Sequence, residues 1–255
     1  MPLYGTLDTA SVAARLPRLA DLDTEAWSLP KAETLQLAFE VPTDTWALLP
    51  KAMHPAVPAY AIVAVTRYSE SPVGPFVLAM LRLAGRAGAH PRGFVLGGVA
   101  SSAAAANALR ERWGLPVEAG EVSLVRRHDR VMARASLGGR PILDAALVNP
   151  EAISPSDVQY INWVTLAQAP LDGVTKPMLV QVDPKHTLHK AERGRPEVSL
   201  LDAAAWNAGP LKPLNPIVAT MAVSDTDLPR IRFVMDTEIP VFKGTRRIRE
   251  SREGE

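Results

Sequence analysis

Short apolar runs separated by turns are the feature that most limits how this chain can fold. Each run has the length and the composition of a buried strand, and only one long segment reads clearly as a helix. The expected strands are residues 33–41, 59–68, 77–82, 93–99, 141–146 and 160–167. This density of strands predicts an α+β fold with largely antiparallel sheets and few helices.

Two further strand pairs are expected from local pattern. Residues 121–127 and 131–137 flank a short polar turn, and the second run alternates apolar and polar positions, which is typical of a hairpin. Near the C-terminus, residues 217–223 are expected to pair with residues 230–235.

Helices are expected at two places. The clearer one runs from about Ser101 to Trp113, because a serine can cap it, alanines fill it and Gly114 ends it. Residues 9–27 are expected to form the other, since their apolar residues recur on one face.

Composition narrows the classes of function. The net charge is +1, so nothing favours binding to nucleic acid or to a membrane surface. The chain has no cysteine and no apolar run of 18 residues, so disulfides, thiol catalysis and a transmembrane helix are not expected. The first residues lack a signal peptide pattern, which favours a cytoplasmic location. We expect one domain over residues 1–242, followed by a charged, disordered tail over 243–255.

The segment that follows the expected helix carries a family resemblance. Arg110, Glu111 and Pro116 stand where the acetoacetate decarboxylase family has G-R-E, four variable residues and P-K-K. The likeness covers roughly residues 29–247, and its main segments are E-T-L-Q-L-A-F-E-V (33–41), L-L-P-K-A-M-H-P (48–55), V-G-P-F-V-L-A-M-L (73–81) and R-E-R-W-G-L-P-V-E (110–118). It implies a closed or cone-shaped β-barrel core around a small-molecule pocket, in a homo-oligomer.

The same resemblance implies that the polar residues of the family's site are replaced here. The family's Schiff-base lysine falls on Val117 and its partner lysine on Glu118. One pocket glutamate falls on Leu78 and another near Ala61, while the pocket arginine falls near Ala32. A coherent set of such changes implies a different chemistry.

The missing lysine argues against decarboxylation through an imine. A lysine attacks a ketone only when it is neutral, and its ordinary pKa is about 10.4. Burial and a neighbouring cation lower that pKa, and acetoacetate decarboxylase is the standard example. Valine offers no nucleophile, and a neighbouring glutamate would raise the pKa of a lysine. Among the other lysines, Lys31 is the least implausible substitute because it lies beside an expected strand.

Glu118 is the candidate catalytic residue, because it is the one ionisable group at the mapped lysine pair. In an apolar pocket it could act as a general acid or base; alternatively it faces solvent or pairs with Arg110 or Arg112. The residues expected to line the pocket are Ala61, Phe76, Leu78, Phe94, Trp113 and Val117. The large apolar ones, Phe76, Phe94 and Trp113, are more often plain core in proteins.

Metal and cofactor sites are not expected. The segment H-T-L-H-K-A-E contains His186, His189 and Glu192. Its H-x-x-H spacing is much less specific for zinc than the H-E-x-x-H motif, and a solvated polar loop explains these residues better. Two classes of function remain open. One is a diverged enzyme that acts on a carbonyl-bearing metabolite by acid–base chemistry, and the other is a non-catalytic binder of an apolar or aromatic small molecule. A collapsed pocket with only a structural role is a third possibility.

Overall fold

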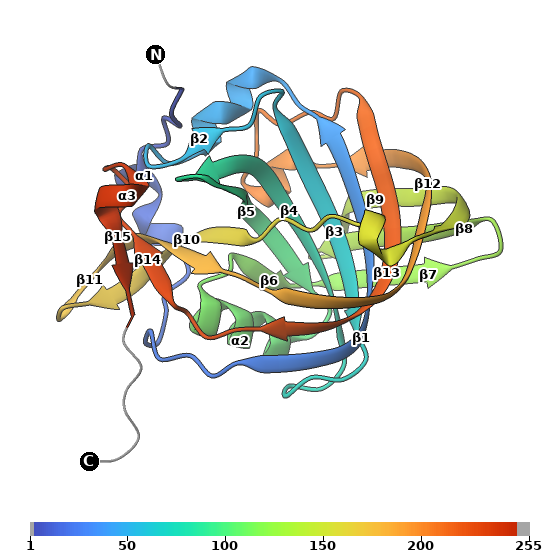
Figure 1. Cartoon of the computed structure of the whole chain (residues 1–255), viewed down its shortest axis with the longest axis horizontal. Coiled ribbons are helices and arrows are strands. Elements are labelled where there is room, and N and C mark those ends of the chain that lie inside the picture. The colour runs from blue at the N-terminus through green and yellow to red at the C-terminus, as the bar shows by residue number, and fades with distance from the viewer. Residues whose placement is uncertain (1–2, 249–255) are drawn as a thin grey trace.

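A single large sheet organises residues 3–248, the part of the chain that this computed structural model describes (Figure 1). Its strands are β1 (Trp27–Glu40), β2 (His54–Pro55), β3 (Tyr60–Tyr68), β4 (Phe76–Ala87), β5 (His90–Ala100), β6 (Val117–Ala119), β7 (Glu121–Arg126), β8 (Arg130–Leu137), β9 (Arg140–Ile153), β10 (Trp163–Leu171), β11 (Val174–Val182), β12 (Lys185–Leu201), β13 (Pro216–Leu228), β14 (Phe233–Met235) and β15 (Thr245–Arg247). The α-helices are α1 (Thr9–Val12), α2 (Ala103–Trp113) and α3 (Val241–Gly244).

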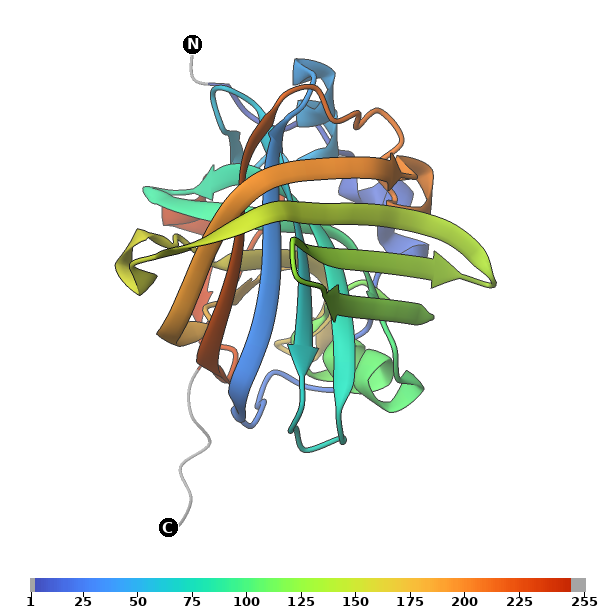
Figure 2. The same ribbon diagram turned by 90° about the vertical axis from the view of Figure 1, so that its right-hand side faces the viewer.

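The strands pair in the order β15-β14-β11-β10-β5-β4-β3-β1-β13-β12-β9-β8-β7. Every pair along this path is antiparallel except β10 with β5, and β6 adds a second parallel pair at β5. Figure 2 shows β9 and β12 crossing in front of β1, β3 and β4, so the sheet is strongly coiled. Few helices and a mostly antiparallel sheet confirm the expected fold class. Over residues 3–248 no strand pairing joins the two ends of the path, so hydrogen bonds do not close the ladder into a barrel.

Two hydrophobic clusters occupy the two faces of the sheet. Side chains alternate across a strand, so neighbouring residues on one strand enter different clusters. The larger cluster lies between β1, β3 and β4 on one side and β7, β8 and β9 on the other. The smaller cluster lies on the opposite face and packs against α2. Any site on this sheet therefore belongs to one face or the other.

The junction between α2 and β6 forms as the sequence predicts. Ser102 caps the helix by accepting a hydrogen bond from the backbone of Ala105, and Gly114 ends it at a φ of 65°. Glycine adopts this left-handed conformation at little cost. The chain then enters β6, where Val117 lies opposite Gly98 of β5.

The expected helix over residues 9–27 is wrong. Only α1 and a short 3-10 helix, Ala13–Arg15, form there. Pro17 explains the early end, because proline disfavours helical backbone at the residue before it and lacks an N–H. Leu16 is accordingly extended, with a ψ of 144°.

The expected pairing of residues 217–223 with 230–235 is also wrong. β13 continues to Leu228 and is flanked on both sides by β1 and β12, so it has no free edge for a hairpin partner. β14 pairs with β11 and β15 instead.

Two polar stretches are strands where the sequence favoured loop or tail. Residues 185–201 form β12, and its many polar side chains are tolerated because most of its outer face is solvated. Residues 245–247 of the expected tail form β15, while residues 249–255 lie outside the described residues.

The expectation of one domain over residues 1–242 stays a prediction. No helix within residues 3–248 has the length and apolar character needed to span a membrane.

A buried arginine cluster as the candidate functional site

Arg82 carries a buried guanidinium, and no acid within residues 3–248 neutralises it. It lies on β4, in the same face as Leu78 and Met80, and only 2% of its surface is exposed. Its Nη1 donates to the carbonyl of Ile161 and its Nη2 to Oε1 of Gln36, both at a long 3.4 Å. Over residues 3–248 it makes no ion pair, and its Nε has no hydrogen-bond partner. A buried charge without an opposite charge is costly.

Local sequence makes room for this arginine. Gly93 on β5 faces it, and a Cβ there would lie 3.2 Å from the Arg82 Cδ. The β4–β5 register also shifts between Leu81 and Arg82. Such bulges are common beside functional sites because they redirect a side chain. The guanidinium lies 5.7 Å from the ring centre of Trp163, a favourable cation–π distance.

Two buried tyrosines accompany Arg82. Burial raises the pKa of Tyr68 to about 12, although Thr66 and Arg82 act in the opposite direction. Burial likewise raises the pKa of Tyr160 to about 12, opposed by Thr34 and Arg82. Both phenols therefore stay protonated at neutral pH and can donate hydrogen bonds. The hydroxyl of Tyr160 is buried and, although Thr34 is near enough to lower its pKa, it makes no hydrogen bond of normal geometry within the described range.

We refer to Thr34, Gln36, Thr66, Tyr68, Arg82 and Tyr160 as the Arg82 cluster. The two threonines share a hydrogen bond of 3.0 Å between β1 and β3. Gln36 holds the segment that carries Tyr160, because its Nε2 donates to the carbonyl of Gln159 at 3.1 Å. Residues 158–162, which lead from β9 to β10, thus cross the face of the sheet that carries Gln36 and Arg82.

His186 borders this cluster from β12. Its ring lies 4.6 Å from that of Tyr160, and its Nδ1 is 2.9 Å from Oγ1 of Thr226. Burial, followed by the charge of Arg82, lowers the pKa of His186 to about 4. The imidazole is therefore neutral over the physiological range.

The residues expected to line a pocket divide between the two faces. Four of them belong to the smaller cluster, on the same face as Arg82: Phe76, Leu78, Trp113 and Val117. Ala61 and Phe94 belong to the larger cluster on the other face. Val117 is fully buried, and its Cγ2 would be 2.9 Å from a Cβ on Gly98. The structure therefore brings Arg82 to the face of the mapped lysine position, Val117.

Glu118 follows Val117 on β6 and lies on the opposite face. It is exposed and lines a cavity of about 220 Å³ together with Phe94. The structure therefore separates Glu118 from Leu78 and Val117, its expected neighbours. Its catalytic role stays a prediction.

His186, His189 and Glu192 do not converge. His189 instead contacts Asp225 at 2.9 Å, while Glu192 pairs with Arg126. Among residues 3–248, no three histidine, aspartate or glutamate side chains are grouped so that they could hold a metal ion.

Sequence reasoning missed the Arg82 cluster, although one signal was present. In A-M-L-R-L-A the arginine interrupts an apolar strand that is buried on both faces. An arginine at such a position indicates a functional role, because arginine is rarely buried without a partner. No comparable indication for Tyr160 was present in the sequence, because this residue lies in an irregular segment outside the strands.

The family profile "Acetoacetate decarboxylase (ADC)" matches residues 16–237. The chain belongs to the acetoacetate decarboxylase family. No curated protein matches the chain.

Solved structures agree on the fold. An acetoacetate decarboxylase from Legionella pneumophila superposes with a TM-score of 0.73 at 19% identity, covering 82% of this chain and 86% of its own. The enduracididine biosynthesis enzyme MppR complexed with pyruvate gives 0.66 at 15% identity, over 84% and 91%. An acetoacetate decarboxylase-like enzyme from Sphingomonas wittichii RW1 gives 0.65 at 16% identity, over 89% and 97%.

Proposed function

We propose that the chain binds a small carbonyl compound that bears a carboxylate, with the carboxylate on Arg82, and acts on it without a lysine imine. The observation that carries this proposal is the buried guanidinium of Arg82, which lacks an acid within residues 3–248. A carboxylate ligand would supply the missing charge through strong, charge-assisted hydrogen bonds. MppR, a relative of the same fold, is described in complex with pyruvate, which supports a keto acid as the ligand.

The positions of the lysines support chemistry without an imine. A reactive amine must be neutral, and burial is the main way to achieve that. All seven lysines of the chain are exposed or half-buried. Lys31, the substitute that the sequence favoured, is exposed, and its backbone N–H donates to Asp225.

Acid–base chemistry has candidate groups in the cluster. The Tyr160 hydroxyl is a buried donor without a partner, so it could hydrogen-bond to a carbonyl oxygen and stabilise the enolate formed when a proton leaves the adjacent carbon. His186, which is neutral and whose ring contacts Tyr160, accepts the proton that leaves the carbon. In this proposal Tyr160 and His186 replace Glu118 as the proton-transfer groups, because Glu118 lies on the other face.

A non-catalytic binder is the second candidate function. It is favoured by the apolar side chains that share the face with Arg82, namely Leu78, Met80 and Val117. Such a surface can hold a ligand without supplying a strong base.

Deuterium exchange distinguishes the two candidates. We would incubate the protein in D₂O with acetoacetate, pyruvate and larger keto acids and follow the carbon-bound protons beside the carbonyl by NMR. Catalysed exchange that is lost in Arg82→Met and kept in Arg92→Met supports the enzyme. Saturable binding without exchange supports the binder.

Borohydride reduction tests the absence of an imine. Reduction in the presence of the same keto acids, followed by intact mass measurement, should give no covalent adduct. An adduct that maps to a lysine would overturn the mechanism.

We also propose that the protein forms a homo-oligomer, which light scattering in solution would test.

A further inference from the structure

The cavity on the other face of the sheet has an apolar floor. Its volume is about 220 Å³, and Phe94 and Leu96 of β5 line it together with Leu166 of β10. The N-terminal segment forms the facing wall with Val12 and Leu16. An apolar cavity of about 150 Å³ is large enough to bind benzene. This one can therefore hold an aromatic ring or a branched alkyl group together with a small polar group.

Three charged residues line the same cavity. Arg15 comes from the N-terminal segment, Arg110 from α2 and Glu118 from β6. Arg110 donates to the carbonyl of Val117 at 3.3 Å, while the side chains of Arg15 and Glu118 make no hydrogen bond or ion pair over residues 3–248. Two arginines and one glutamate leave one excess positive charge. The polar end of the cavity is thus suited to a single negative charge.

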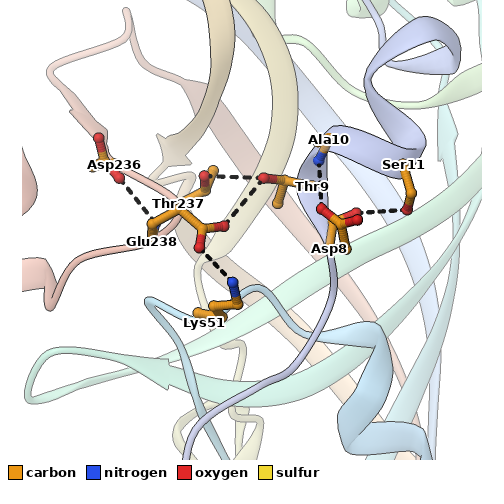
Figure 3. Close-up of polar contacts among 8 residues, drawn as sticks. All are labelled: Asp8, Thr9, Ala10, Ser11, Lys51, Asp236, Thr237 and Glu238. Atoms are coloured by element: carbon orange, nitrogen blue, oxygen red, sulfur yellow. Dashed lines mark hydrogen bonds and ion pairs between the residues drawn. The ribbon is translucent and has the colours of Figure 1, made fainter.

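The N-terminal wall is held in place by polar contacts that Figure 3 shows. Oγ1 of Thr9 lies 3.2 Å from Oγ1 of Thr237 and donates to Oε1 of Glu238 at 3.4 Å. Lys51 binds the other oxygen of Glu238 at 2.7 Å. A further contact comes from β10, where Nε2 of Gln168 donates to the carbonyl of Ala13 at 3.0 Å. These contacts fix the N-terminal segment against the rest of the fold, so it forms a defined wall of the cavity.

This wall is largely outside the part of the chain that the family profile matches. The match begins at residue 16, whereas Leu7, Val12 and Arg15 precede it. The cavity is also separate from the Arg82 cluster, because Val117 and Glu118 are consecutive on β6 and face opposite sides.

We propose that this cavity is a second ligand site, which binds a small aromatic or branched aliphatic monocarboxylate. The apolar body lies on Phe94, Leu96 and Leu166, and the carboxylate pairs with Arg15. Glu118 disfavours ligands with a second negative charge by repulsion. The proposal does not depend on the function of the Arg82 cluster.

Calorimetric titration with phenylacetate tests the proposal, with 2-phenylethylamine as the probe of opposite charge. We expect saturable binding of phenylacetate and none of the amine. Arg15→Met should weaken phenylacetate binding at least tenfold, because the paired charge is lost. Arg18→Met is the matched control, since Arg18 is exposed on the same segment and does not line the cavity. It should bind like the unaltered protein.

Two further variants locate the bound molecule. Leu16→Trp fills the cavity from a half-buried position and should abolish binding, with circular dichroism to verify folding. Arg82→Met should leave binding unchanged. The proposal is overturned if phenylacetate does not bind at millimolar concentration, if Arg15→Met binds as well as the unaltered protein, or if Arg82→Met abolishes binding.

Discussion

Two arginines are buried on neighbouring strands, and their surroundings differ in one respect. Arg92 on β5 is 6% exposed and forms an ion pair with Asp183, with Gln181 as a further partner. Arg82 on β4 is 2% exposed, and within residues 3–248 its hydrogen-bond partners are an amide oxygen and a backbone carbonyl. Burial lowers the pKa of both guanidinium groups. Within residues 3–248, an acid pairs with Arg92 and none pairs with Arg82.

The difference separates a structural arginine from a functional one. Where a buried cation serves the fold, the chain supplies the opposite charge, because an uncompensated charge costs stability. At Arg82 the uncompensated charge destabilises the folded protein. This is typical of a binding site whose opposite charge comes from a ligand. Substitutions in and around the two arginines test this difference.

Arg82→Met should weaken keto acid binding by at least about 100-fold, because charge-assisted hydrogen bonds to the carboxylate are lost. The melting temperature should stay the same or rise, since methionine fills similar space without a buried charge. Calorimetric titration and thermal unfolding measure the two effects. A large fall in stability would mean that Arg82 serves the fold, as Arg92 does.

Arg92→Met should show the reverse pattern. It leaves Asp183 without its cation, and a loss of about 1–3 kcal/mol in the free energy of unfolding is expected. Asp183 is partly solvated, which keeps the loss below that of a fully buried pair. Chemical denaturation measures the change. Keto acid affinity should remain within about twofold of the unaltered protein, and a marked fall in that affinity would erase the contrast.

The pH dependence of stability should report on His186 beside the cluster. Its pKa falls from 6.5 to about 4 on folding. Between these pH values the imidazole is protonated in the unfolded chain and neutral in the folded one. Stability from this residue is complete above pH 6.5 and is lost as the pH falls toward 4, at about 1 kcal/mol per pH unit. His186→Gln should remove this slope. Denaturation curves of both proteins between pH 7 and 4 test it, and identical slopes would contradict it.

Tyr160→Phe should have the smallest effect. It removes a buried hydroxyl that has no partner within the described chain, so stability should not fall. Keto acid binding should weaken about 3–10-fold if the hydroxyl donates to the ligand, the value of one ordinary hydrogen bond. Calorimetric titration is again the measurement. Unchanged affinity would remove Tyr160 from the site.

Local pattern predicted much of the fold. The helix α2 and the hairpin of β7 and β8 form where capping residues and alternation placed them, because these signals act within a few residues. Predictions failed where distant segments decide. The sequence could not show that β13 would be enclosed by β1 and β12, or that the polar residues of β12 would form a strand between β9 and β13.

The site was predicted less well, for a related reason. The mapped position Val117 lies on the same face as Arg82, but Glu118 lies on the other, because successive residues of a strand point in opposite directions. The likeness at one short motif could not give the direction of each side chain. Nor could it show that Gln36 and Tyr160, 124 positions apart, would meet beside Arg82.

The NMR signal of the Arg82 Nε–H group, assigned by its absence in Arg82→Met, shows directly whether a carboxylate binds to Arg82. Titration with pyruvate and acetoacetate should shift this signal to saturation as the carboxylate binds, while the Arg92 signal stays in place. An Arg82 signal that does not move under conditions where the keto acid is bound would contradict the assignment of Arg82 as the carboxylate site.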